Sequence, residues 1–96
     1  MRIVITAEAE RDLDNHFDYI FERNPEAATR VYDAIVGQIM SLRDFAYRAR
    51  PGRVPGTREL VIQKYPYIVV FEVTADEVTI LHVNHARQQW LREPLG

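Results

Sequence analysis

The chain has 96 residues, a formal net charge of −2 and no cysteine. That length, without a long linker or a repeat, predicts one domain over residues 1–96, and the lack of cysteine excludes disulfides and thiolate metal sites. The longest apolar run, residues 67–71, is too short for a signal-peptide core or a membrane span, so we expect a cytoplasmic protein without a membrane partner. Nine acidic and five basic residues in 1–44 contrast with five acidic and seven basic residues in 45–96, so an anion site is expected in the second part.

The first elements expected are a strand and two helices. A β-branched run at residues 2–6 leads into Thr6, which suits a helix N-cap because acids follow it in the first turn. Asn24 and Pro25 then read as an N-cap and a first helical position between two helices. Each helix carries an apolar stripe at helical spacing, made of Leu13, Phe17, Ile20 and Phe21 in the first and of Ala28, Val31, Ile35, Ile39 and Leu42 in the second. This pattern predicts a helical hairpin packed on another layer.

Three strands are expected in the second half of the chain. Runs at 57–64, 67–74 and 77–84 are rich in β-branched and aromatic residues and are separated by two-residue connections, which indicates a three-stranded antiparallel meander. The middle run is apolar on both alternations, so it should lie inside the sheet, with the hairpin on one face and the other face left for a partner or a site. The fold class is therefore α+β, in the order β-α-α-β-β-β, and a short C-terminal helix is expected before Pro94.

The basic residues between the helices and the meander are the first candidate site. The planar guanidinium group of arginine suits phosphate or carboxylate, but for Arg48 and Arg50 a solvated loop is the preferred interpretation, because nothing in the sequence fixes their direction. Arg58 is expected on one strand face with Leu60, Ile62 and Lys64, where an ion pair with Glu72 is a competing structural use. Glu72 and Glu59 look like the most exposed strand carboxylates. The candidate binding set consists of Arg48, Arg50, Arg53, Arg58, Lys64 and Trp90.

Two histidines near the end of the last run form the second candidate site. His82 and His85 are three residues apart and should point to opposite faces of a strand, so no metal site is expected, and no cofactor-binding motif is present. His85, followed by Arg87, suits proton transfer at a phosphate, while a bond from its ring to a backbone carbonyl is an equally good reading. His82 shares the alternation of the preceding apolar residues and is expected to be structural. Trp90 is expected to seal a core edge, with base stacking as the alternative.

Several segments of the sequence, in this order and spacing, resemble those of a known family. They are the helical segment TAEAERDLDNHFDYIFERNPEAATRVYDAI, then RPGRVPGTREL, YPYIVVFEV and EVTILHVNHARQQW. Together they resemble the RelE/ParE superfamily of toxins from bacterial type II toxin-antitoxin modules, which includes plasmid stabilisation proteins. The resemblance runs from Thr6 to Trp90 and is closer to the ParE branch.

The resemblance implies a toxin that a cognate antitoxin neutralises by folding onto it. ParE-like members poison DNA gyrase without chemistry of their own, and this is the preferred hypothesis. RelE-like members are ribosome-dependent messenger RNA endoribonucleases. Under that alternative, Arg58, His85 and Arg87 are the candidate catalytic residues. A non-toxic module that only binds an antitoxin is the third hypothesis.

Overall fold

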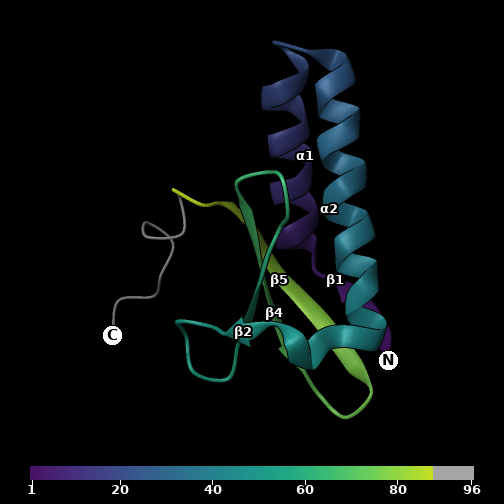
Figure 1. The fold of residues 1–96 in the computed structure, drawn as a ribbon, viewed down its shortest axis with the longest axis vertical. Helices are drawn as coiled ribbons and strands as arrows, with labels where there is room; N and C mark the ends of the chain where they lie inside the picture. Colours follow the sequence, from purple (N-terminus) through teal and green to yellow (C-terminus); the bar gives the residue numbers. More distant parts are fainter. Residues whose placement is uncertain (88–96) are drawn as a thin grey trace.

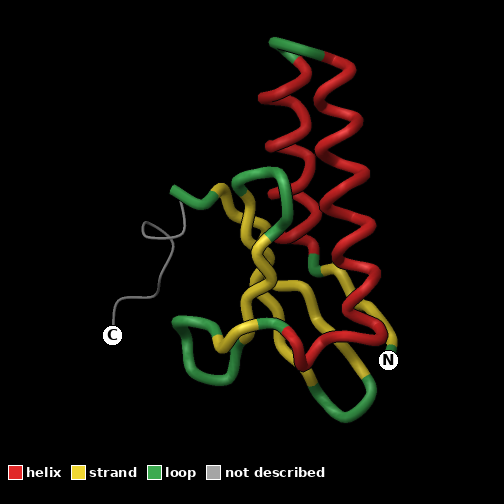
Figure 2. Tube along the Cα trace, in the orientation of Figure 1, coloured by secondary structure: helices red, strands yellow, loops and turns green. Residues whose placement is uncertain are grey.

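The computed structural model of the chain describes residues 1–87 (Figure 1). Strand β1 (Arg2–Ile5) is followed by helices α1 (Ala7–Phe21) and α2 (Pro25–Phe45), a 3-10 turn η1 (Ala46–Arg48), and strands β2 (Arg50–Pro51), β3 (Arg58–Val61), β4 (Tyr67–Val73) and β5 (Glu77–His85). Figure 2 shows the two helices side by side above the strands. The α+β class and the predicted order of the main elements are confirmed. None of the helices within residues 1–87 is long and apolar enough to cross a bilayer. The short helix expected before Pro94 lies outside the described residues.

The caps of both helices follow the sequence signals. The Thr6 hydroxyl accepts a hydrogen bond from the Ala9 N–H at 3.2 Å, and Asn24 Oδ1 accepts one from the Ala27 N–H at 3.1 Å. Each bond satisfies one of the N–H groups that a helix start leaves without an intrahelical partner. Pro25 follows Asn24 at the first position of α2, where its missing N–H costs nothing.

The five strands form one mixed sheet in the order β1-β5-β4-β3-β2. The meander of β3, β4 and β5 is antiparallel as predicted, but the expectation of an antiparallel sheet throughout is wrong at its edge, because β1 runs parallel to β5. A parallel neighbour is possible because the helical hairpin and the strands β2, β3 and β4 all lie between β1 and β5 along the chain, which gives the long connection that such a pair needs. The two-residue strand β2 was not predicted, and it pairs with β3 through Arg50 and Pro51.

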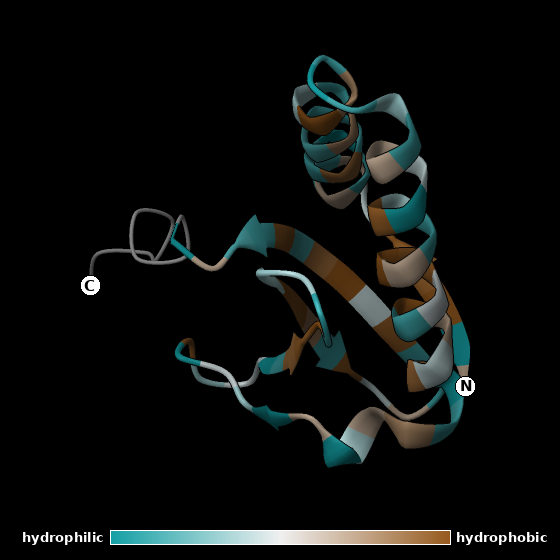
Figure 3. Ribbon diagram, turned by 45° about the horizontal axis from the view of Figure 1, so that its top comes forward, coloured by the Kyte–Doolittle hydropathy of each residue, from teal (hydrophilic) through white to brown (hydrophobic). Residues whose placement is uncertain are grey.

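The core lies between the hairpin and one face of the sheet. Figure 3 shows hydrophobic colour on the strands and at intervals along both helices. The sheet contributes Tyr67, Val69 and Phe71 of β4 with Val78, Ile80 and Val83 of β5, and the helices contribute Leu13, Ile20, Val31, Ile35, Ile39 and Leu42 of the predicted stripes. Phe21, predicted as part of the first stripe, is instead 49% exposed at the end of α1. Burying these apolar side chains supplies most of the free energy of folding.

An irregularity in β5 changes which residues face this core. Val70 of β4 pairs with His82, while the next residue, Phe71, pairs with Ile80, so Leu81 is an extra residue in β5. Such a bulge shifts the side-chain alternation by one position. The expectation that His82 shares the alternation of Val78 and Ile80 is therefore wrong. After the bulge, His85 and not His82 lies on the same face of the sheet as these core residues.

Candidate functional site

The two candidate sites of the sequence lie at opposite ends of β4. Arg58 is paired with Phe71 near one end, and His85 is paired with Tyr67 at the other. Four residues of an extended strand separate these positions, which corresponds to about 13 Å at about 3.3 Å per residue. The structure therefore brings His85 and Arg87 together and keeps Arg58 apart from them.

At the Phe71 end, a buried carboxylate organises the arginine loop. Glu59 is only 3% exposed and accepts two hydrogen bonds at Oε1 from Arg50, one from Nε at 3.0 Å and one from Nη2 at 2.8 Å. Its Oε2 accepts a third bond from the Arg53 backbone N–H at 3.1 Å. Two expectations are corrected here, because Glu59 is buried rather than exposed and Arg50 is oriented by an ion pair rather than free on a loop.

The loop between β2 and β3 is tightly built as well. The Gly52 N–H donates to the Thr57 carbonyl at 2.8 Å, and the Thr57 hydroxyl donates to the Val54 carbonyl at 2.7 Å. A Cβ at Gly52 would lie 2.1 Å from Thr57 Oγ1, so no other residue fits there without a shift of the loop. Gly56 has a φ of +87°, a conformation that glycine adopts without steric cost.

Arg58 is held on the helix side of the sheet. Its Nη1 donates to the Ala49 carbonyl at 3.2 Å, and its guanidinium lies 4.9 Å from the ring centroid of Tyr47. These contacts take the place of the ion pair with Glu72 that was expected as an alternative. Arg58 and Tyr47 line a hollow of about 260 Å³ together with Pro51, Gly56, Thr57 and Val73.

The remaining basic candidates are dispersed. Arg48 places its guanidinium 4.5 Å from the centroid of the Phe45 ring. Lys64 lies beyond the end of β3, in the turn before β4, with a φ of +76° that is unfavourable for a residue with a Cβ. It therefore does not continue the strand face of Arg58 as expected, whereas Leu60 and Ile62 do belong to that core-facing side. Trp90 lies outside the described residues.

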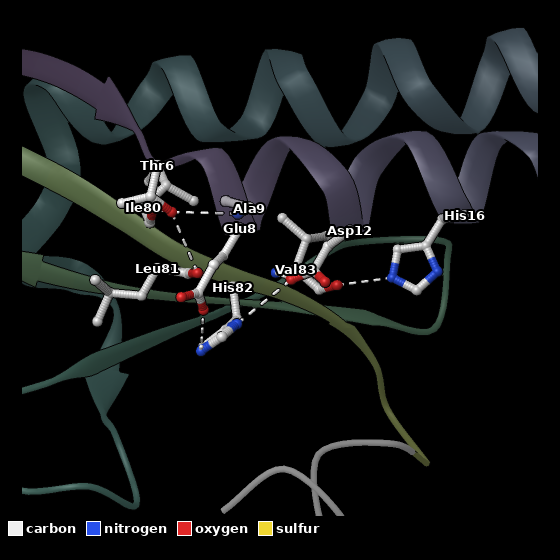
Figure 4. A network of polar contacts seen from close by, with 9 residues as sticks. All are labelled: Thr6, Glu8, Ala9, Asp12, His16, Ile80, Leu81, His82 and Val83. Atoms are coloured by element: carbon white, nitrogen blue, oxygen red, sulfur yellow. Dashed lines mark hydrogen bonds and ion pairs between the residues drawn. The ribbon is translucent and has the colours of Figure 1, made fainter.

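At the Tyr67 end, α1 runs along the part of β5 that β1 does not reach. The Asp12 carboxylate accepts a hydrogen bond from the Val83 N–H at 3.0 Å, and His16 Nε2 donates to the Val83 carbonyl at 2.7 Å. Figure 4 shows both side chains meeting this residue of β5 from successive turns of the helix. Two side chains one turn apart thus supply the donor and the acceptor that a neighbouring strand would have supplied.

The same network includes His82. Its Nδ1 lies 3.5 Å from Asp12 Oδ2, and its Nε2 lies 3.7 Å from Glu8 Oε2 (Figure 4). His82 thus joins β5 to α1, although not through the strand alternation from which its structural role was predicted. Within residues 1–87, no three histidine or carboxylate side chains come together as a metal site.

A groove of about 720 Å³ opens beside this network. It is lined from α1 by Asp12, Asn15, His16 and Tyr19, from β4 by Tyr67, and from the end of β5 by His85 and Arg87. The Tyr67 ring makes edge-on contacts with His16 and His85, at centroid distances of 4.8 Å and 5.4 Å. Burial raises the pKa of the Tyr67 hydroxyl, and the neighbouring Tyr19 raises it further, so this phenol stays protonated and can act as a hydrogen-bond donor.

Sequence reasoning found His85 and Arg87 but missed the contributions of α1 to this groove. Asp12 and His16 are four residues apart beside the apolar stripe of α1, and this spacing is the signal that both reach the same neighbour. His85 Nδ1 accepts a hydrogen bond from the Arg87 N–H at 3.2 Å. Through this bond the ring organises the turn that follows β5.

Comparison with known proteins places these observations in one family. Residues 3–90 match the model of the ParE toxin of the type II toxin-antitoxin system parDE. A Sinorhizobium fredii protein that is provisionally classed as a toxin, Y4kP, is 43% identical over 89 residues, which cover 93% of this chain and 92% of the relative.

Two solved structures have a similar fold. The chromosomal ParDE toxin-antitoxin system from P. aeruginosa contains a chain that is 32% identical, with a TM-score of 0.83 over 88% of this chain and 95% of the other. The RelBE2 toxin-antitoxin complex from Mycobacterium tuberculosis contains one that is 22% identical, with a TM-score of 0.55 over the same shares, and this likeness concerns the fold alone.

Proposed function

The chain belongs to the ParE toxin family of type II toxin-antitoxin systems, and from this premise we propose that it inhibits DNA gyrase by binding. The observation that carries the choice of a binding inhibitor is the separation of Arg58 from His85 and Arg87 along β4. A protein that acts by binding does not need these residues to converge on one reacting atom. A gyrase inhibitor of this kind would act in the cytoplasm.

The same separation weighs against a nuclease built from the three predicted catalytic residues. A phosphate stabiliser and a proton-transfer group must both reach the same phosphate, within hydrogen-bond distance of its atoms. The backbone positions of Arg58 and His85 are about 13 Å apart along β4, so both side chains would have to extend toward each other to share one phosphate. Arg58 also donates to the Ala49 carbonyl, and Arg50 is neutralised by Glu59, which lowers the free positive charge available to a phosphate.

The test uses one preparation of the full chain, purified free of antitoxin, in two assays. We expect inhibition of plasmid supercoiling by gyrase and accumulation of linear plasmid, which reports trapped cleavage complexes. In a translating extract, the same preparation should leave messenger RNA uncut. Gyrase that keeps full activity in molar excess of the folded protein would refute the proposal.

Messenger RNA cleavage remains the second candidate because of the groove at the Tyr67 end. Two imidazoles, His16 and His85, lie on either side of Tyr67, and Arg87 lines the same space. This set could position and cleave a phosphodiester without Arg58. In that case, His85→Ala would abolish cutting in the translating extract, whereas Arg58→Ala would leave it largely intact.

We also propose that a cognate antitoxin binds this chain. ParE toxins of type II systems pair with an antitoxin, and the described residues 45–59 hold four arginines and one acid, Glu59, which pairs with Arg50; the remaining positive charge suits an acidic antitoxin segment. A short reading frame next to this one should encode that partner. Co-expression should restore the growth that expression of the chain alone arrests. Unimpaired growth with folded chain alone would favour the third hypothesis, a module without toxicity.

A further inference from the structure

Two arginines at the Phe71 end, Arg50 and Arg58, differ in how their charge is balanced. Arg50 binds Glu59 Oε1 through both Nε and Nη2, which together form one edge of the guanidinium. Arg58 instead uses Nη1, which donates to the uncharged carbonyl of Ala49 at 3.2 Å. This bond leaves the Nε–Nη2 edge of Arg58 unused, and no carboxylate within residues 1–87 forms an ion pair with it. The edge with which Arg50 binds a carboxylate is thus available on Arg58.

Arg58 keeps a fixed position even though its charge is not balanced. The residue is half-buried, and its guanidinium is held between the Ala49 carbonyl and the ring of Tyr47, whose centroid lies 4.9 Å away. A carbonyl and a neutral ring attract a cation but leave its net charge in place. Because a long side chain loses rotamer freedom when it binds a ligand, a guanidinium that is already oriented binds an anion at a lower entropic cost.

The hollow of about 260 Å³ beside this guanidinium combines one charge with apolar surface. Arg58 is the one charged residue of its described lining, which otherwise consists of Tyr47, Pro51, Gly56, Thr57 and Val73. The tyrosine ring, the proline and the valine offer contact to a short hydrocarbon stem, and the guanidinium edge suits a carboxylate at the end of that stem. A nucleic-acid strand carries a charge on every phosphate and is held by several basic groups, which the described lining does not offer. The lining therefore favours an acidic side chain.

We propose that this hollow binds one aspartate or glutamate side chain of an acidic peptide, whose carboxylate pairs with the Nε–Nη2 edge of Arg58. The inference rests on the proposed antitoxin for the source of the peptide, and it names the arginine that receives the acid. Arg50 contributes less, because a second carboxylate would have to displace Glu59, which is only 3% exposed. Loss of Arg58 should therefore weaken the peptide complex more than loss of Arg50.

An NMR titration of the isotope-labelled full chain, purified free of antitoxin, tests the proposal. The probe is N-acetylglutamate α-amide, whose single charge is the side-chain carboxylate, added at neutral pH and constant ionic strength. We expect a saturable shift of the Arg58 Nε–H resonance with a Kd of about 1 mM or weaker, the range open to a ligand of this size. N-acetylglutamine α-amide has the same shape without the charge and should not shift that resonance. The Nε–H resonance of Arg50 should stay in place, because it is bonded to Glu59.

Three variants locate the effect. Arg58→Gln removes the guanidinium and should weaken binding about tenfold or more, as expected for charge-assisted hydrogen bonds. Arg30→Gln is the matched control, because it removes the same charge from an exposed position near the end of α2 that is remote from η1, and it should leave the Kd unchanged. Tyr47→Ala, at a position that is 66% exposed, removes the ring beside the guanidinium and should weaken binding about two- to fivefold.

A carboxylate probe that shifts the Arg58 resonance no more than its amide counterpart would overturn the proposal, and so would equal weakening by Arg58→Gln and Arg30→Gln. If circular dichroism shows Arg58→Gln to be unfolded, Tyr47→Ala decides, and an unchanged Kd in that variant counts against the hollow. Inorganic phosphate is the second probe, and saturation by phosphate at lower concentrations than by the carboxylate would assign the hollow to a phosphate group instead. The titration uses neither antitoxin nor gyrase, so its failure leaves the proposed function standing, and failure of the proposed function leaves the titration result intact.

Discussion

The two ends of β4 are built by contacts of very different range along the chain. At the Phe71 end, Arg50 binds a carboxylate nine residues away, and Arg58 donates to a carbonyl nine residues away. At the Tyr67 end, His16 and Asp12 bind Val83 across 67 and 71 residues. The Phe71 end is thus assembled within a short segment of the chain. The Tyr67 end exists only once the helical hairpin has packed on the sheet. Charges at the first end are locked in place, while the second leaves an open groove lined by rings.

The largest expected effect comes from removing the carboxylate that organises the local end. Glu59→Ala deletes the acceptor of three hydrogen bonds and leaves the Arg53 N–H without this partner, so we expect a loss of about 2–3 kcal/mol in the free energy of unfolding. The value is below that of a fully buried ion pair because Arg50 is half exposed and returns to water. Urea denaturation of the variant and of the unmodified chain measures this change in the free energy of unfolding. Glu72→Ala, at an exposed position on the same face of the neighbouring strand, is the control and should change stability by no more than about 0.5 kcal/mol. Equal values for the two variants would show that Glu59 does not organise the loop.

A smaller effect is expected at the long-range end. Asp12→Ala removes the acceptor of the Val83 N–H and one neighbour of His82, which should cost about 1–2 kcal/mol. Asp12→Asn retains an acceptor oxygen and should lose less. Asp14→Ala, an exposed position of the same helix, serves as the control in the same urea series. If Asp12→Ala and Asp14→Ala unfold at the same urea concentration, the edge of β5 does not need its helical cap.

The smallest effect concerns the phenol in the groove and depends on pH. Burial raises the pKa of Tyr67 above its ordinary value of 10.0, so the folded state keeps the proton after the unfolded chain has begun to lose it. The stability that this group contributes is complete below pH 10 and is lost as the pH rises through the folded-state pKa. Tyr67→Phe should therefore show a shallower decline of unfolding free energy above pH 10 than the unmodified chain. Parallel declines would mean that Tyr67 ionises as freely in the fold as in the unfolded chain.

The range of the contacts also decides what could be read from the sequence. Helical stripes, caps and strand alternation are local patterns. They predicted the helical hairpin, the meander and most of the residues that form the core between them. A two-residue strand such as β2 has no periodicity to detect, and Pro51 within it argues against a strand. The parallel pairing of β1 with β5 joins residues at opposite ends of the chain, and no short pattern encodes it.

The candidate sites show the same division. His85 and Arg87 were found because they are two residues apart at the end of a predicted strand, whereas His16 and Tyr19 belong to a helix of which only the apolar stripe was interpreted. Glu59 was misjudged because strand alternation predicts which face a side chain points to but not whether a loop returns to cover it. The folded loop of Arg50 and Arg53 buries that carboxylate, and only the tertiary structure reveals it.

The extra residue Leu81 in β5 shifts the side-chain alternation of the strand by one position. Upstream of it, even-numbered positions face the helices, and downstream of it, odd-numbered positions do. Deleting this one residue would turn His82 and Asn84 inward and carry His85 to the opposite face, away from the groove, with no change in the chemical nature of any of them. In related chains, a length difference of one residue at this point would therefore matter more for which side chains meet α1 than several substitutions elsewhere in the strand.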